Sequence, residues 1–334
     1  MTPSRQDTTM RIAVTGSIAT DHLMAYPGRF TEHFISDHLD TVSLSFLVDD
    51  LEVRRGGVAA NISFGLAQLG LSPALVGAVG KDFDDYRAWL NGHGVDTRFV
   101  RVSPTRHTSR FLCTTDLDQN QIASFYAGAM QEAREIELAP VAAGLGGLDL
   151  VLVAPNDPDA MLRHTAEARS LGLPFAADPS QQLARMDGES VRSLVDGATY
   201  LFTNEYESVM LQQSTGWSAN DILDRVGAWI TTLGGEGVRV ERRNHAPLTV
   251  RAVAVEEEVD PTGLGDAFRA GFLWGMWARL GLERACQVGC AIAATALESL
   301  GTQEYKLSRT ALSDRIARAY GGGAAGEIES RLRI

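Results

Sequence analysis

Short apolar runs and longer amphipathic runs alternate along most of this chain of 334 residues. The short runs are typical of buried strands and lie at 11–15, 74–79, 150–154, 174–177, 200–203 and 228–233. The helix-like runs lie between and after them, at 58–69, 82–91, 157–171, 205–212, 266–279 and 283–300. Strands that alternate with helices favour a parallel sheet with helices on both faces. The predicted fold class is therefore α/β, with a doubly wound, mainly parallel sheet.

Two regions interrupt this alternation and lack a helical pattern. Apolar residues recur among polar ones over 42–54, and 108–126 contains two strand-like runs around a polar turn at 116–120. We predict that these regions form a small antiparallel sheet, a discontinuous lid with segments near 19–55 and 106–127. A lid is a mobile cover that excludes water from a reaction, so this feature favours an enzyme.

The rest of the chain predicts one domain without internal repeats or long linkers. The runs at 238–243 and 248–255 indicate a hairpin that extends the main sheet at its edge. Residues 1–9 are polar and predict a disordered extension, which leaves 10–334 as the folded domain. The glycine-rich segment 321–326 is interpreted as a surface loop before a terminal helix.

Charge and cysteine content narrow the range of partners. The net charge is −12 and the pI is about 5.1, so we expect a small-molecule partner rather than nucleic acid or a membrane. The three cysteines give no disulfide framework and favour the cytoplasm. Cys286 and Cys290, four apart in an apolar helical run, are interpreted as buried small hydrophobes. No apolar stretch approaches the ~20 residues that a membrane-spanning helix needs.

The segment 260–268, DPTGLGDAF, places two glycines and a carboxylate where a loop turns into an apolar helix. Gly263, Leu264 and Gly265 are expected to present backbone N–H groups in the first turn, where the helix dipole favours an anion. Asp266 is then placed to accept a proton from an attacking hydroxyl. This arrangement predicts phosphoryl transfer to a small molecule. The alternative is that Asp266 only caps the helix and the glycines only make a turn.

Two further motifs offer groups that suit a sugar. Gly57 follows a second glycine and opens a helix, so that backbone N–H groups and the Asn61 amide can point into one pocket. Asp21 comes just after the turn that follows the first strand, where the carboxyl ends of parallel strands form a crevice. A carboxylate there can accept hydrogen bonds from two vicinal hydroxyls. The alternatives are a tight turn at the glycines and a helix-capping or surface role for Asp21.

Two strand ends offer groups that suit a nucleotide and its metal. Asn204 and Glu207 follow one strand, and their oxygens can order water around Mg²⁺, which keeps several of its waters. Residues 232–237 form a glycine-rich strand end that suits a nucleotide. The alternatives are a helix cap with an exposed first-turn acid at Asn204 and Glu207, and a plain hairpin turn at 232–237.

In this order along the chain, the motifs resemble those of the ribokinase-like family of carbohydrate and nucleoside kinases, the PfkB family. The family's two glycines followed after three residues by Asn match 56–61, its Asp-Thr-x-Gly-Ala-Gly-Asp signature matches 260–266, and its Asn-x-x-Glu motif matches 204–207. Pro261 and Leu264 depart from the family's Thr and Ala. Neither position needs its side chain to bind an anion, so the backbone donors survive both changes.

Within that family, the chain is most similar to the bacterial adenosine kinases, over segments 15–21, 43–48, 178–182 and 260–272. The resemblance implies an enzyme of purine salvage that transfers the γ-phosphate of ATP to the 5′-hydroxyl of adenosine and gives AMP. The nucleoside contacts that it implies are Ser17, Asp21, Gly57, Asn61, Phe111, Phe125, Gln181, Gln182 and Asp266. The ATP contacts that it implies are Asn204, Thr232, Leu233, Gly234, Gly235, Glu236, Gly237 and Gly265.

The resemblance also implies the roles of these groups. Asp266 acts as the base, and the N–H groups of Gly263, Leu264 and Gly265 stabilise the transferring phosphoryl group. Glu207 holds Mg²⁺ through water. The protein is expected to form a homodimer through its lid sheet, because exposed sheet edges commonly recruit a partner. A sugar kinase acting on ribose, fructose or a related sugar, and a catalytically idle nucleoside-binding protein, are the alternatives.

Overall fold

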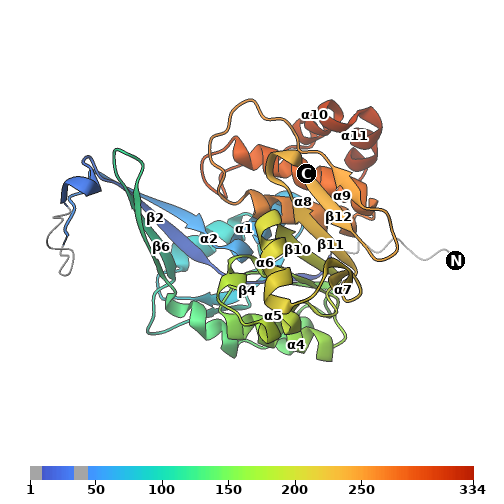
Figure 1. Ribbon diagram of the computed structural model, residues 1–334, viewed down its shortest axis with the longest axis horizontal. Coiled ribbons are helices and arrows are strands. Elements are labelled where there is room, and N and C mark those ends of the chain that lie inside the picture. The colour runs from blue at the N-terminus through green and yellow to red at the C-terminus, as the bar shows by residue number, and fades with distance from the viewer. Residues whose placement is uncertain (1–9, 34–43) are drawn as a thin grey trace.

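The computed structural model describes residues 10–33 and 44–334, and it has an α/β core from which a small sheet projects (Figure 1). The predicted extension at 1–9 lies outside the described residues, as do the first two residues of the run at 42–54. No helix in the described part of the chain is long and apolar enough to cross a membrane.

Among the described residues, the larger sheet has nine strands, most of them parallel. In their order across the sheet they are β13 (Leu248–Val250), β12 (Val238–Glu241), β11 (Ala228–Thr232), β10 (Tyr200–Asn204), β9 (Phe175–Ala177), β8 (Leu150–Val153), β1 (Ile12–Thr15), β4 (Ala74–Val79) and β5 (Val100–Val102). The β11–β12 and β12–β13 pairs are antiparallel. The predicted hairpin therefore does extend the sheet at its edge.

Helices cover both faces of this sheet (Figure 1). They are α1 (Val58–Gln68), α2 (Asp84–Gly92), α3 (Leu138–Gly144), α4 (Pro158–Ser170), α5 (Gly188–Val195), α6 (Glu205–Thr215), α7 (Ala219–Leu223), α8 (Leu264–Trp277), α9 (Gly281–Leu297), α10 (Arg309–Tyr320) and α11 (Gly322–Glu329). Ile12 and Val14 of β1 are buried in one core with α1, α8 and α9, whereas Ala13 is buried in the other with α4 and α5. The strands of the larger sheet are buried on both faces, and for this reason they appear in the sequence as continuous apolar runs. The predicted doubly wound fold is confirmed.

The smaller sheet corresponds to the predicted lid, and we keep that name for it. Within the described residues its strands are, in order, β3 (Asp50–Gly56), β2 (Ala19–Ala25), β6 (Ser109–Thr115) and β7 (Gln121–Tyr126). The polar turn between β6 and β7 was predicted, and there Asp116 accepts hydrogen bonds from the backbone N–H groups of Asp118 and Asn120 at 2.9 and 2.8 Å. Two details differ from the prediction: β2 pairs parallel with β6, and the described part of the run at 42–54 becomes a strand only from Asp50.

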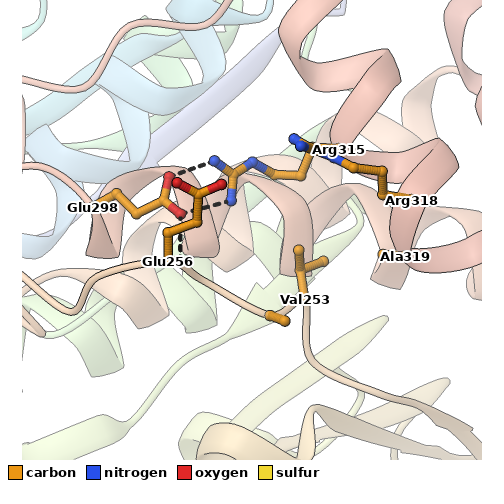
Figure 2. Close-up of a pocket in the computed structure, with 7 residues that line it drawn as sticks. Val253, Glu256, Glu298, Arg315, Arg318 and Ala319 are labelled. Carbon is orange, nitrogen blue, oxygen red and sulfur yellow. Dashed lines mark hydrogen bonds and ion pairs between the residues drawn. The ribbon is translucent and has the colours of Figure 1, made fainter.

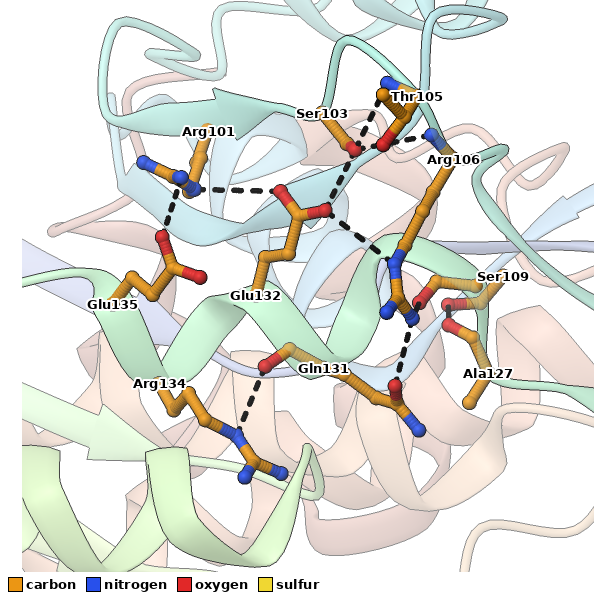
Figure 3. A network of polar contacts seen from close by, with 11 residues as sticks. Arg101, Ser103, Thr105, Arg106, Ser109, Ala127, Gln131, Glu132, Arg134 and Glu135 are labelled. Carbon is orange, nitrogen blue, oxygen red and sulfur yellow. Dashed lines mark hydrogen bonds and ion pairs between the residues drawn. The ribbon is translucent and has the colours of Figure 1, made fainter.

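A polar network joins the base of the lid to the core (Figure 3). The Ser103 hydroxyl donates to Glu132 at 2.7 Å and accepts a hydrogen bond from the backbone N–H of Arg106 at 3.1 Å. The Arg106 guanidinium donates to Gln131 at 2.7 Å. Glu132 and Gln131 belong to the 3-10 helix η3 (Gly128–Glu135), which follows β7. The network therefore fastens the loop that enters the lid to the segment that leaves it.

The prediction of a surface loop at 321–326 was wrong, because α11 begins at Gly322. Ala324, Ala325 and Ile328 are buried on one side of this helix and pack into the main core. Each glycine lowers helix stability by about 1 kcal/mol relative to alanine, and tertiary packing of these apolar residues overrides that cost. Helices α3, α5, α7 and α10 were not predicted either.

Candidate active site

The start of α8 has the geometry of an anion site. Gly263 is the N-cap in the left-handed conformation, with φ 76°, and the helix begins at Leu264, two residues before the predicted boundary. A Cβ at Gly263 would lie 2.8 Å from Cγ2 of Thr302, so both backbone and space require glycine here. The N–H groups of Gly263, Leu264 and Gly265 lie at the positive end of the helix dipole, where an anion is stabilised. We call this segment the donor loop.

Asp266 lies in the first turn of α8 and is partly exposed. Its Oδ2 accepts a hydrogen bond of 2.8 Å from Nδ2 of Asn61, so two motifs that are 205 residues apart in the sequence meet. Burial raises the pKa of Asp266 to about 7, although the Asn61 hydrogen bond and the charge of Arg269 both lower it. A carboxylate with a pKa near neutrality is suited to accept a proton from a substrate.

A buried ion pair lies behind Asp266. Arg269, one turn further along α8, contacts Asp178, which follows β9, with two N–O distances of 2.6 Å. Both side chains are buried, and the guanidinium carbon lies 5.4 Å from the ring centroid of Phe202. A Cβ at Gly265 would lie 2.7 Å from the guanidinium, so positive charge is present directly behind the donor loop. Although Asp178 balances this charge, the positive end of the ion pair faces the donor loop, and that orientation favours an anion bound there.

The lid is tied to the donor loop through β3. Arg54 of β3 donates to Asp260 at 3.0 Å, and Asp260 also accepts hydrogen bonds from the backbone N–H groups of Thr262 and Gly301 at 2.9 and 3.0 Å. Gly57 links β3 to α1 with φ 94°, and a Cβ there would lie 2.6 Å from the backbone of β2. The end of β3 is thus held against the donor loop, and only glycine fits at the turn that follows it.

Asp21, Phe111 and Phe125 form a row across the lid sheet. Asp21 of β2 is in register with Phe111 of β6, which is in register with Phe125 of β7, so the three side chains share one face. Arg54 is paired with Asp21 on its other side, and a Cβ at Gly56 would lie 2.9 Å from Oδ2 of Asp21. Burial raises the pKa of Asp21, against the charge of Arg54. Asp21 was predicted just after the turn that follows the first strand, and the structure places it there, on strand β2 of the lid sheet.

Three other predicted nucleoside contacts differ in their environment: two already have a hydrogen-bond partner within the protein, and the third is exposed. The Ser17 hydroxyl accepts a hydrogen bond of 3.0 Å from the backbone N–H of Val58 and so caps α1. Gln182 is buried, and its Nε2 donates to the carbonyl of Asn156 at 2.8 Å. Gln181 is exposed in the 3-10 helix that follows β9. Contacts of these side chains with a nucleoside stay predictions.

A cleft of about 680 Å³ borders the donor loop and has the size of a small-molecule site. The predicted ATP contacts that line it are Thr232, Gly234, Gly235, Gly237 and Gly265. Leu233 and Glu236 belong to the same turn but do not line the cleft. Leu264 lines its wall, as does Cys290, which is buried in α9 together with Cys286, as predicted.

A smaller pocket of about 340 Å³ adjoins this cleft (Figure 2). The two share Val253 and Ala254. Glu298 forms an ion pair with Arg315 across the smaller pocket and accepts a hydrogen bond of 3.3 Å from the backbone N–H of Glu256. These contacts fasten the segment after β13 to α9 and α10, and so support one wall of the larger cleft.

Asn204 and Glu207 form a capping box at the start of α6, which was the alternative interpretation of this motif. Asn204 Oδ1 accepts from the N–H of Glu207, and Glu207 Oε2 accepts from the N–H of Asn204, both at 2.8 Å. The other carboxylate oxygen of Glu207 accepts from the Ser180 hydroxyl at 3.2 Å. Within the described ranges there is no group of three or more His, Cys, Asp or Glu side chains arranged to hold a metal. A carboxylate with both oxygens already hydrogen-bonded fits contact with Mg²⁺ through water better than direct ligation.

Some residues of the site were not predicted from the sequence. Thr302 and Gln303 both contact Oδ1 of Asn61 at 2.9 Å, yet they lie in a loop without a recognisable motif. Arg269 was missed as well. A charged residue in the otherwise apolar run of α8 was the signal that could have found it, because a buried arginine needs a buried partner.

Comparisons with known proteins identify the family to which most of the chain is similar. A family model described as "pfkB family carbohydrate kinase" matches residues 14–309 of this chain. The nucleoside kinase of Methanothermobacter thermautotrophicus is 31% identical to this chain over 273 residues, which cover 80% of this chain and 86% of that protein.

Solved structures give the same picture. The nucleoside kinase of Burkholderia thailandensis in complex with inosine is 34% identical to this chain, with a TM-score of 0.80, and the match covers 93% of this chain and 98% of that one. The structure of the same protein in complex with ADP-inosine has a TM-score of 0.79 and 35% identity, and it covers 93% of this chain and 96% of that one.

Proposed function

This chain belongs to the pfkB family of carbohydrate kinases, and we propose that within it the protein is an adenosine kinase, which transfers the γ-phosphate of ATP to the 5′-hydroxyl of adenosine and gives AMP for purine salvage. The observation that carries the proposal is the contact between Asn61 and Asp266, because it joins a sugar-binding motif to a base beside the donor loop. The curated and solved nucleoside kinases support a nucleoside as the acceptor. We place the enzyme in the cytoplasm.

The proposed reaction is a direct in-line transfer. The 5′-oxygen attacks the γ-phosphorus of ATP, its proton passes to Asp266, and the bond from the γ-phosphorus to the β–γ bridging oxygen breaks to release ADP. The N–H groups of Gly263, Leu264 and Gly265, with the charge of Arg269 behind them, stabilise negative charge on the phosphoryl oxygens. Bound Mg²⁺ would neutralise charge on the ATP phosphates, and Glu207 would hold it through water.

The lid supports a nucleoside rather than a bare sugar. Asp21 lies in the same row as Phe111 and Phe125, so a ribose held by Asp21 would have its base near two aromatic rings. Aromatic side chains stack well on a purine, whereas a free sugar would leave these apolar surfaces uncovered. A sugar kinase would share the donor loop and Asp266 and would not need this row.

A panel of four acceptors tests the proposal. With purified protein, ATP and Mg²⁺, we expect ADP production with adenosine to have the largest kcat/KM, with inosine lower and with ribose and fructose near background. Asp266→Asn measured in parallel controls for contaminating kinases. A preference for ribose or fructose would establish the sugar kinase instead, and binding of adenosine without ADP production would establish the idle nucleoside-binding protein.

We also propose that the protein is a homodimer in which two lid sheets meet. On the face opposite Asp21, Leu51, Met24 and Ile122 lie in one cross-strand row, and Leu51 and Ile122 are 54% and 42% exposed. In the described chain the edges of β3 and β7 are unpaired. A second copy related by a twofold axis would present the same apolar row, so that each copy would cover the apolar row and an unpaired strand edge of the other.

Size-exclusion chromatography with light scattering tests the dimer. Wild type is expected to elute as a dimer and Leu51→Glu as a monomer, because a charge in the row would be buried without a partner. Leu171→Glu, a matched change of an exposed leucine on the core, is expected to leave the dimer intact. A monomeric wild type at micromolar concentration would contradict the proposal.

A further inference from the structure

We propose that Gln303 is a positioning residue, which fixes the Asn61 amide in the orientation that donates to Asp266 and ties that orientation to the end of lid strand β3. The inference rests on the proposed function, since it takes Asp266 as the base. It starts from a chain of hydrogen bonds that runs from the backbone of Gly56 to the carboxylate of Asp266.

The direction of every bond in this chain follows from its first acceptor. The carbonyl of Gly56 can only accept, so the Tyr86 hydroxyl, 2.9 Å away, donates its single hydrogen to it. The Tyr86 oxygen must then accept at its other contact, which is Nε2 of Gln303 at 2.5 Å. Gln303 therefore points its NH₂ group, and not its oxygen, into the site.

The same NH₂ group fixes Asn61. Its second hydrogen goes to Oδ1 of Asn61 at 2.9 Å, which leaves the Asn61 NH₂ group on the side of Asp266, where Nδ2 donates to Oδ2 at 2.8 Å. If the Asn61 amide were turned over, two NH₂ groups would face each other and a carbonyl oxygen would face a carboxylate. Both contacts are repulsive, so Gln303 allows only one orientation of Asn61.

Thr302 plays a different part. Its hydroxyl has one hydrogen and two acceptors within reach, Oδ1 of Asn61 at 2.9 Å and the carbonyl of Arg55 at 3.0 Å. It therefore cannot set the direction of the Asn61 amide by itself. Gln303 can set the direction of the Asn61 amide, because both of its N–H groups are used and its own orientation is set by Tyr86.

These hydrogen bonds are strong because the side chains that form them are buried. Gln303, Tyr86 and Asn61 are 1%, 4% and 6% exposed, so water cannot readily replace the bonds between them. Gly56 is the last residue of β3, where Arg54 and Arg55 also contact the donor-loop side of the site. The orientation of the base is thus coupled to the position of the lid strand that carries Arg54.

Gln303→Leu tests the inference, because leucine has similar bulk and cannot donate. We expect kcat to fall by about tenfold, the effect of losing one buried hydrogen bond, with little change in the KM for ATP. The acidic limb of the kcat–pH profile should move to higher pH, because a loosened Asn61 no longer lowers the pKa of Asp266. Gln287→Leu, at a buried glutamine of α9 away from the site, should leave the profile unchanged.

A double-mutant cycle separates positioning from general damage. In an Asn61→Ala background, Gln303→Leu should have almost no further effect on kcat, since its only route to Asp266 is removed. An unshifted profile in a Gln303→Leu protein with wild-type circular dichroism, or full additivity with Asn61→Ala, would overturn the inference. A wild type inactive on every nucleoside, or an acidic limb that persists in Asp266→Asn, would instead overturn the proposed function.

Discussion

Asp266→Asn is expected to lower kcat by about 10²- to 10⁴-fold, the usual contribution of a positioned base, while adenosine still binds with nearly unchanged affinity. Asparagine has the shape of aspartate, and its Oδ1 can still accept the hydrogen bond from Asn61 that holds Oδ2 at 2.8 Å. The variant therefore keeps the geometry of the site and loses only the ability to take the proton. Steady-state kinetics with saturating ATP and calorimetric titration with adenosine separate the two quantities.

The wild-type pH profile provides the control for this variant. Because Asp266 has a pKa of about 7 and acts in its deprotonated form, kcat/KM should rise as the pH increases through 7 and then level off. This limb should be absent from the residual activity of Asp266→Asn. Turnover within a few-fold of wild type in a folded variant would remove Asp266 from the role of base.

The same variant should also differ from wild type in its free energy of unfolding, and the raised pKa of Asp266 determines the direction of the difference. The folded protein holds the Asp266 proton up to about pH 7, whereas the unfolded chain releases it near pH ~4. The folded state binds more protons between these values, so this group lowers the free energy of unfolding as the pH rises through that window. Urea unfolding should therefore find Asp266→Asn more stable than wild type at pH 8 and close to it at pH 4.

The sequence predicted best those parts of the fold in which one physical demand dominates. Strands such as β4 are buried on both faces, so their apolar runs have the boundaries that the structure has, 74–79. The turn from loop to helix at 260–268 was predicted from its two glycines and its carboxylate, although α8 begins at Leu264, two residues before the predicted start. The terminal helix was predicted to begin only after residue 326, whereas α11 begins at Gly322, because its stability comes from packing against distant elements, which local composition does not record.

The candidate site shows the same division. Asn61 and Asp266 each belong to a motif, and the resemblance of those motifs to one family placed them in one site. Gln303 belongs to no motif, and its contact with Asn61 joins residues 242 positions apart. No pattern within a short window encodes such a contact, so only the three-dimensional structure could identify the residue that orients the amide.

Asp21→Ala is expected to weaken adenosine binding by about 10²-fold or more. A carboxylate that accepts two ribose hydroxyls makes two charge-assisted hydrogen bonds, each contributing about 1.5–3 kcal/mol, and part of this is offset because burial already disfavours the charged form. The kcat at saturating adenosine should change less than the affinity, since Asp21 lies on lid strand β2 and Asp266 on α8. Calorimetry and saturation kinetics measure the two effects.

Asp50→Ala is the matched control, because it removes an exposed acid from the same face of the lid, at the far end of β3. If Asp21 acts through the general charge of the lid, both variants should weaken binding alike, whereas a specific ribose contact predicts a loss only for Asp21→Ala. Binding should also weaken as the pH falls through the raised pKa of Asp21, since a protonated carboxyl accepts hydroxyls poorly. An unchanged dissociation constant in Asp21→Ala would show that Asp21 does not hold the ribose hydroxyls, and would leave the lid aromatics without a ribose contact to align the purine.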